Sequence, residues 1–82
     1  MKAATEKYTA HLPKNRNASD YVTLRMVRGA VKATDEYGLV EYFCNGHLIE
    51  CNDHYTYQPW QVRSGRNLYF ETLTDAVAFC RA

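Results

Sequence analysis

Two cysteines and two histidines recur at one spacing in the middle of the chain, as Cys44-x-x-His47 and Cys51-x-x-His54. Two thiolates and two imidazoles are a ligand set that suits tetrahedral zinc. The intervening Asn45–Gly46, however, predicts a type I′ hairpin turn, in which residue 44 opposes residue 47 and residue 40 opposes residue 51. Cys44 and Cys51 then share a face but lie about 13 Å apart. We therefore expect no metal site and no disulfide here, and two small core residues instead.

The same hairpin register places Glu41 directly opposite Glu50. Opposed carboxylates occur in hydrolase sites, but in a short exposed hairpin they are more typical of a solvated acidic patch or of one that meets an external cation. The sequence contains no nucleophile elbow and no glycine-rich phosphate loop. We therefore expect a protein that is not an enzyme and that uses no cofactor.

The net charge of +1 hides two blocks of opposite sign. Residues 1–32 carry seven lysines and arginines against two acids, whereas residues 33–53 carry five acids and no lysine or arginine. The basic block favours a small nucleic-acid-binding module, with Tyr21 available for stacking and with cations at Lys14, Arg16, Arg25, Arg28 and Lys32. A net charge near zero makes direct nucleic-acid binding the alternative rather than the first choice.

Alternating apolar residues predict an α+β fold, with a small antiparallel sheet of about four to five strands, including two hairpins, packed by one C-terminal helix. We expect an edge strand at 8–12 before Pro13, a polar loop at 14–20, and hairpins over 39–51 and 60–71. Thr72 and Asp75 form a capping box at the start of a helix over 72–81. The face of this helix that should pack on the sheet contains Leu73, Ala76, Val77 and Cys80.

Residues 21–34 are open to two interpretations. Their alternation changes phase near Gly29, which indicates a strand with a bulge or bend. Val22, Met26 and Ala30 also share one helical face, so a helix is the alternative, although the valine and threonine content favours a strand. The following Asp35–Gly38 predicts a tight turn.

Eighty-two residues predict a single domain over 1–82, of which 1–20 form a partly loop-like basic N-terminal segment. The start has no signal-peptide pattern, and no stretch reaches the ~20 apolar residues of a membrane span. Three cysteines without an export signal indicate reduced thiols. We therefore expect a cytoplasmic protein without a membrane partner.

A compact sheet with one helix, segregated charge, surface aromatics and no catalytic set resembles the general plan of small inhibitor proteins of phages and mobile elements, such as the anti-CRISPR proteins. The resemblance implies an inhibitor or adaptor that docks on a larger host protein or ribonucleoprotein and blocks a basic, nucleic-acid-binding surface.

The residues expected to make that contact are acids for charge and aromatics for anchoring. They are Asp35, Glu36, Tyr37, Glu41, Glu50, Asp53, Tyr55, Tyr57 and Trp60. A homodimer that pairs through an edge strand is compatible with either function.

Overall fold

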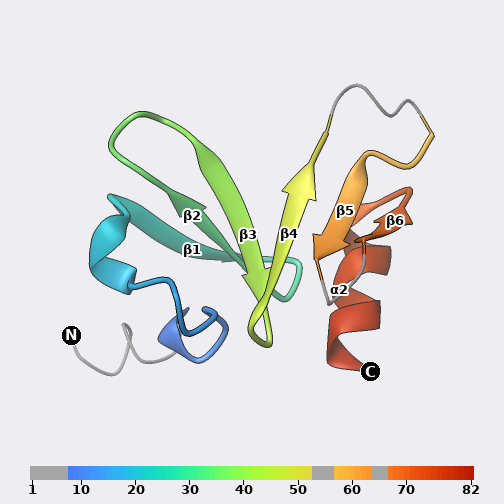
Figure 1. Ribbon diagram of the computed structural model, residues 1–82, viewed down its shortest axis with the longest axis horizontal. Helices are drawn as coiled ribbons and strands as arrows, with labels where there is room; N and C mark the ends of the chain where they lie inside the picture. Colours follow the sequence, from blue (N-terminus) through green and yellow to red (C-terminus); the bar gives the residue numbers. More distant parts are fainter. Residues whose placement is uncertain (1–7, 53–56, 64–66) are drawn as a thin grey trace.

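The computed structural model describes residues 8–52, 57–63 and 67–82. In these residues the chain forms one six-stranded antiparallel sheet in the order β1-β2-β3-β4-β5-β6, followed by helix α2 (Figure 1). Every strand pairs with the next one along the chain, so the sheet is a meander. The α+β class and the C-terminal helix are confirmed. The elements are β1 (Thr23–Val27), β2 (Ala30–Thr34), β3 (Val40–Cys44), β4 (His47–Cys51), β5 (Trp60–Arg63), β6 (Asn67–Phe70), the short 3-10 helix η1 (Ala18–Asp20) and α2 (Leu73–Arg81).

The extra strand comes from residues 21–34, which form a hairpin rather than one bulged strand or a helix. Arg28 and Gly29 have φ angles of 53° and 89°, the left-handed pair that a type I′ turn requires. β1 and β2 pair along their whole length, from Thr23–Thr34 to Val27–Ala30. The change of phase near Gly29 is therefore the reversal of the chain. The preference for strand over helix is confirmed by β1 and β2, whereas the expected bulge in a single strand was wrong.

The Asn45–Gly46 turn is confirmed, with φ angles of 51° and 83° and with Cys44 opposite His47. The pairing of β3 with β4 ends at Tyr42–Ile49, however, and the two strands then diverge (Figure 1). Glu41 pairs with Ala33 on β2, and Glu50 pairs with Gln61 on β5. The expected Glu41–Glu50 pair is therefore wrong. Neighbouring strands of a twisted sheet are rotated relative to one another. Here β3 stays paired with β2 and β4 stays paired with β5, so the sheet opens between β3 and β4.

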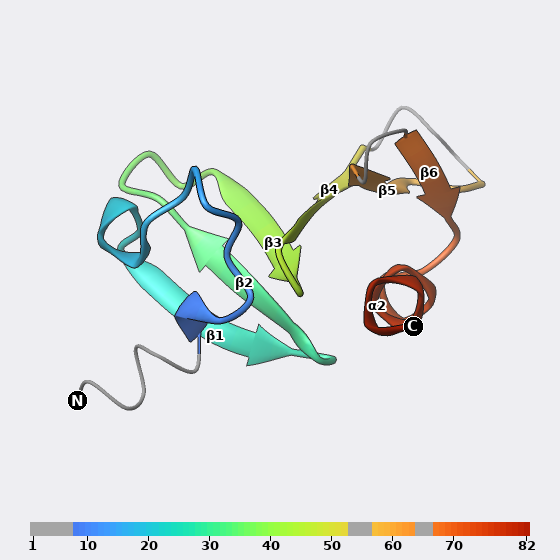
Figure 2. The ribbon, with the colours of Figure 1, turned by 60° about the horizontal axis from the view of Figure 1, so that its bottom comes forward.

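Different parts of the chain pack on the two faces of the sheet. On the helix face, which carries Tyr42 and Ile49, the predicted apolar side of α2 packs on a core that includes Ala30, Cys44 and Val62. Thr72 caps this helix, since its side chain accepts a hydrogen bond from the Asp75 N–H at 3.1 Å. On the other face, the N-terminal segment (residues 8–21) packs on Phe43. Figure 2 shows these two parts over different halves of the sheet, with the N-terminal segment by β1–β3 and α2 by β5 and β6.

The N-terminal segment does not contain the expected edge strand at 8–12. His11 and Leu12 donate backbone hydrogen bonds to Tyr8 and Thr9, both at 3.0 Å, which is the spacing of a turn. Leu12 is buried against Ala33 and Phe43. A segment that crosses a sheet face has no neighbouring strand to pair with, so its alternation does not produce a strand.

His11 fastens the N-terminal segment to the β3–β4 turn. Its carbonyl oxygen accepts the Gly46 N–H at 2.8 Å, and its Nδ1 accepts the Asn45 N–H at 3.1 Å. Only a neutral imidazole can accept at Nδ1. The pKa of His11 lies below its ordinary value because burial desolvates the ring and because Arg81 adds a like charge.

We expect this contact to make stability depend on pH. With the His11 pKa lowered by folding from 6.5, the unfolded chain binds the proton more readily, so the stabilisation is complete above about pH 6.5 and is lost as pH falls through the folded-state pKa. Urea unfolding should therefore give a lower free energy at about pH 5.5 than at about pH 7.5. The variant His11→Asn keeps an acceptor that does not titrate, and it should lose this part of the pH dependence. If the free energy of unfolding depends on pH in the same way in His11→Asn and in the unmodified chain, the neutral His11 ring does not contribute to stability through this contact.

The three cysteines lie in different surroundings. Cys44 is buried as expected, and its Sγ donates to the Gly29 carbonyl oxygen at 3.7 Å. Burial, with a smaller effect from the neighbouring Cys44, raises the pKa of Cys80 to about 11. Cys51 is exposed, so the expectation that it is a core residue was wrong. It lies beyond the last β3–β4 pair, where the diverging strands leave it at the surface.

These surroundings predict that one of the three thiols reacts rapidly with iodoacetamide in the folded protein. Only a thiolate reacts with iodoacetamide, and it must be accessible. Mass spectrometry should show rapid single modification at Cys51, with Cys44 and Cys80 reacting only on unfolding. Cys51→Ser should remove the rapid phase, and a persistent rapid phase in that variant would contradict the assignment.

Candidate functional site

Charge on the sheet is divided by face. Paired residues of antiparallel strands share a face, so Arg25, Lys32 and Tyr42 lie in one row on the helix face. Glu41 and Glu50 lie on the N-terminal face. Each is next along its strand to a residue of the helix face, Tyr42 or Ile49, and neighbouring residues of a strand point to opposite faces. Among the strand residues that the structure describes, no carboxylate lies on the helix face. The helix face of the strands therefore carries the cations Arg25 and Lys32, whereas the N-terminal face carries both carboxylates together with Arg63.

Glu41 holds the N-terminal segment in place. The Tyr21 hydroxyl donates to Glu41 Oε1 at 2.8 Å, and Arg16 Nη2 donates to Oε2 at 3.5 Å. Burial, followed by the hydrogen bond to Glu41, raises the pKa of Tyr21 to about 12. The ring of Tyr21 packs edge-on against Phe43 at a centroid distance of 5.9 Å. Tyr21 and Arg16 therefore have structural partners, and the expectation that Tyr21 is available for stacking was wrong.

Glu50 also has a partner within the chain, because Arg63 Nε donates to its Oε1 at 2.6 Å. Both side chains are about half exposed, at 55% for Arg63 and 40% for Glu50. With Glu41 on Arg16 and Glu50 on Arg63, neither carboxylate needs a cation from outside. The two do not make one acidic site.

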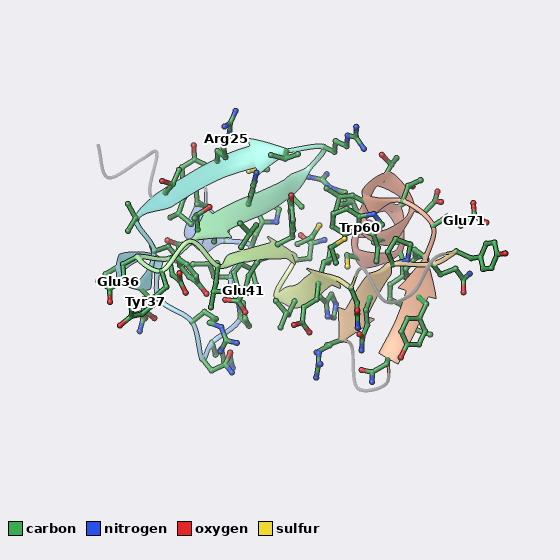
Figure 3. All side chains as sticks on the ribbon, turned by 90° about the horizontal axis from the view of Figure 1, so that it is seen from above. Arg25, Glu36, Tyr37, Glu41, Trp60 and Glu71 are labelled. Carbon is green, nitrogen blue, oxygen red and sulfur yellow. The ribbon has the colours of Figure 1, made fainter. Side chains whose placement is uncertain are left out.

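The Asp35–Gly38 turn is confirmed and is built on Asp35. Its Oδ1 accepts the N–H groups of Tyr37 and Leu39, both at 2.9 Å, and Gly38 has a φ of 84°. The turn leaves Tyr37 81% exposed and Leu39 65% exposed. Figure 3 shows Glu36 and Tyr37 at the end of the molecule far from α2.

Val22 reaches the same end of the sheet. Its N–H donates to the Thr34 carbonyl oxygen at 2.8 Å, while Asp35 donates to Leu39 at 3.0 Å, so Val22 and Leu39 flank the base of this turn. Val22 is 72% exposed. We call Val22, Tyr37 and Leu39 the apolar tip. Sequence reasoning identified only Tyr37. The signal it missed was Leu39, a large apolar residue directly after the turn, whereas Val22 precedes β1 and reaches this end only through strand pairing.

An open groove of about 340 Å³ lies on the helix face, where β3 and β4 diverge. It is lined by Lys32, Val40, Tyr42, Cys51 and Trp60. Tyr42 and Trp60 meet edge to face, with ring centroids 5.3 Å apart. Trp60 is thus half-buried in this groove and lies on the α2 side of the molecule, away from Tyr37 (Figure 3).

The remaining expected residues are scattered. Tyr57 is 87% exposed on the connection before β5, and Asp53 and Tyr55 lie outside the described residues. Lys14 and Arg28 are exposed, on the N-terminal segment and on the β1–β2 turn. Of the five expected cations, the structure therefore places only Arg25 and Lys32 side by side as a cross-strand pair.

The fold and these surfaces define a small six-stranded α+β domain, as far as the chain is described. Comparison with protein-family models, with curated proteins and with solved structures gives no match for this chain. Among the described residues, no group of three or more histidines, cysteines or acids is placed to hold a metal ion. In the same residues, no helix has the length and apolar character needed to cross a membrane.

Proposed function

We propose that this chain is a non-enzymatic binding protein, an inhibitor or adaptor that docks on a larger protein through the apolar tip. The observation that carries the proposal is the exposure of Val22, Tyr37 and Leu39 at one end of the sheet. Single exposed apolar residues are common on protein surfaces, but three large ones at the same end of a small domain favour an interaction site. Tyrosine is also among the residues that contribute most to binding energy at interfaces.

The turn that carries Tyr37 is already ordered. Two backbone N–H groups bind the Asp35 carboxylate, which fixes the backbone on both sides of Tyr37. A preorganised anchor loses little conformational entropy on binding. Glu36 is exposed next to it, which favours a partner surface with an apolar pocket beside a lysine or arginine. A basic surface that binds nucleic acid would have this character, as the resemblance to small inhibitor proteins implies.

Site-specific photocrosslinking tests the proposal. A benzoylphenylalanine at position 37 should crosslink to one protein in a lysate of the cells that carry the gene, whereas the same probe at Phe79, an exposed aromatic on α2, should not. With the purified partner, Tyr37→Ala and Leu39→Ser should each weaken binding by about 2 kcal/mol, or roughly 30-fold.

Tyr57→Ala is the matched control, because it removes an equally exposed tyrosine elsewhere. It should bind as tightly as the unmodified chain. If the folded Tyr37 and Leu39 variants keep full affinity, the apolar tip is not the docking surface.

A further inference from the structure

We infer that the helix-face groove, together with Arg25 beside it, is a binding site for single-stranded nucleic acid, with phosphates on Arg25 and Lys32 and a base against Tyr42 and Trp60. This inference goes beyond the proposed docking function, because it uses another surface. The site combines cations from β1 and β2 with aromatic rings from β3 and β5. The groove stays open because α2 covers the other half of this face.

The cationic half of the site consists of like charges held next to each other. Arg25 and Lys32 are direct cross-strand partners on one face. Like charges in this arrangement repel each other, and an anion bound between them relieves the repulsion. Within the part of the chain that the structure describes, neither residue has an ion pair. The ligand should therefore be an anion.

The aromatic half of the site indicates that the bound anion also carries a base that can stack. Tyr42 follows Lys32 in the same row, and Trp60 lies against Tyr42. The other lining residues, Val40 and Cys51, are uncharged, and the volume of about 340 Å³ falls within the range of small-ligand sites. Adjacent cations and aromatic rings on an open sheet face are how proteins bind single strands, whose bases are free to stack. A duplex would present its phosphates but no free base face.

Trp60 reports directly on the site, because it is the only tryptophan of the chain. Titration of the full chain with a twelve-nucleotide oligothymidylate at low salt should quench its fluorescence. With two phosphates neutralised, the logarithm of the affinity should fall with the logarithm of the salt concentration with a slope of about −1.4. The oligonucleotide should also protect Cys51 from iodoacetamide. If the titration shows neither quenching nor protection, the inference is wrong.

Two double variants that each remove two positive charges test whether binding needs this site or only the positive charge of the protein. Arg25→Gln with Lys32→Gln should weaken binding by at least about tenfold and bring the salt slope close to zero. Lys14→Gln with Arg28→Gln removes the same charge from other places and should change affinity by less than about threefold. Equal losses in the two pairs would overturn the assignment of the phosphates.

Inorganic polyphosphate of similar charge separates base stacking from simple attraction to a polyanion. It should bind at least about tenfold more weakly than the oligonucleotide and leave Trp60 unquenched. Equal affinity and an unchanged fluorescence with both ligands would overturn the role of Tyr42 and Trp60. The double variant Tyr37→Ala with Leu39→Ser should bind the oligonucleotide normally. A loss there would show that the nucleic acid binds at the apolar tip and not in the groove.

Discussion

Replacing Gly29 by alanine should lower the free energy of unfolding by about 2–3 kcal/mol, from backbone strain and overpacking together. Gly29 has a φ of 89°, where any side chain is strained. A Cβ at this position would also lie 3.2 Å from Val77 Cγ1 and 3.4 Å from Arg81 Nε, both on α2. Val77 belongs to the buried core and has little room to move, so the contact adds to the strain. Urea unfolding measures the effect.

Gly38 and Gly46 are matched controls. Their φ angles are 84° and 83°, and a Cβ at either one would meet nothing within 4 Å. Alanine at these positions should therefore lower stability by only about 1 kcal/mol, from the backbone alone. If all three substitutions have equal effects, the close approach of the β1–β2 turn to α2 contributes nothing to stability.

Replacing Glu41 by lysine should lower the free energy of unfolding by about 2–3 kcal/mol, because charged hydrogen bonds are lost in a partly buried place. The substitution removes the acceptor of the Tyr21 hydroxyl and sets a second cation beside Arg16. The Glu41 side chain is only 28% exposed, so water compensates poorly. Trypsin should also cut faster after Lys14 and Arg16, since the N-terminal segment loses this attachment.

Glu50→Lys is the control, because it makes the same change of charge in a more exposed pair. Exposed ion pairs contribute about 0–1 kcal/mol, so this variant should stay close to the stability of the unmodified chain. Its tryptic pattern in the N-terminal segment should not change. A Glu41→Lys variant with unchanged stability and cleavage would show that the segment is held by Leu12 and His11 alone.

Some elements could be predicted because their causes are local. The Asn45–Gly46 turn needs two residues that tolerate positive φ, and this dipeptide favours them in any context. Helix α2 begins where Thr72 caps it, and the spacing of Leu73, Ala76 and Val77 determines which side is buried. The Asp35–Gly38 turn was likewise identified from four adjacent residues.

The β1–β2 turn could not be predicted in this way. Arginine is not a residue that favours positive φ, so Arg28–Gly29 is a weak turn signal beside Asn45–Gly46. In the structure, hydrogen bonds to this turn add to its weak local preference. The Gly29 carbonyl oxygen accepts from Cys44 Sγ at 3.7 Å and from Arg81 Nη2 at 3.4 Å. Contacts with residues far along the chain therefore stabilise this turn.

The sequence by itself determined that the chain has an antiparallel sheet, one C-terminal helix and two blocks of opposite charge. Only the tertiary structure decided which charges meet. Twist separates Glu41 from Glu50 and brings each to an arginine from another element, Arg16 or Arg63. Strand pairing places Arg25 beside Lys32, and the divergence of β3 from β4 opens the groove next to them. These contacts depend on how far each strand pairs, and pairing length is decided by the whole sheet rather than by any local pattern.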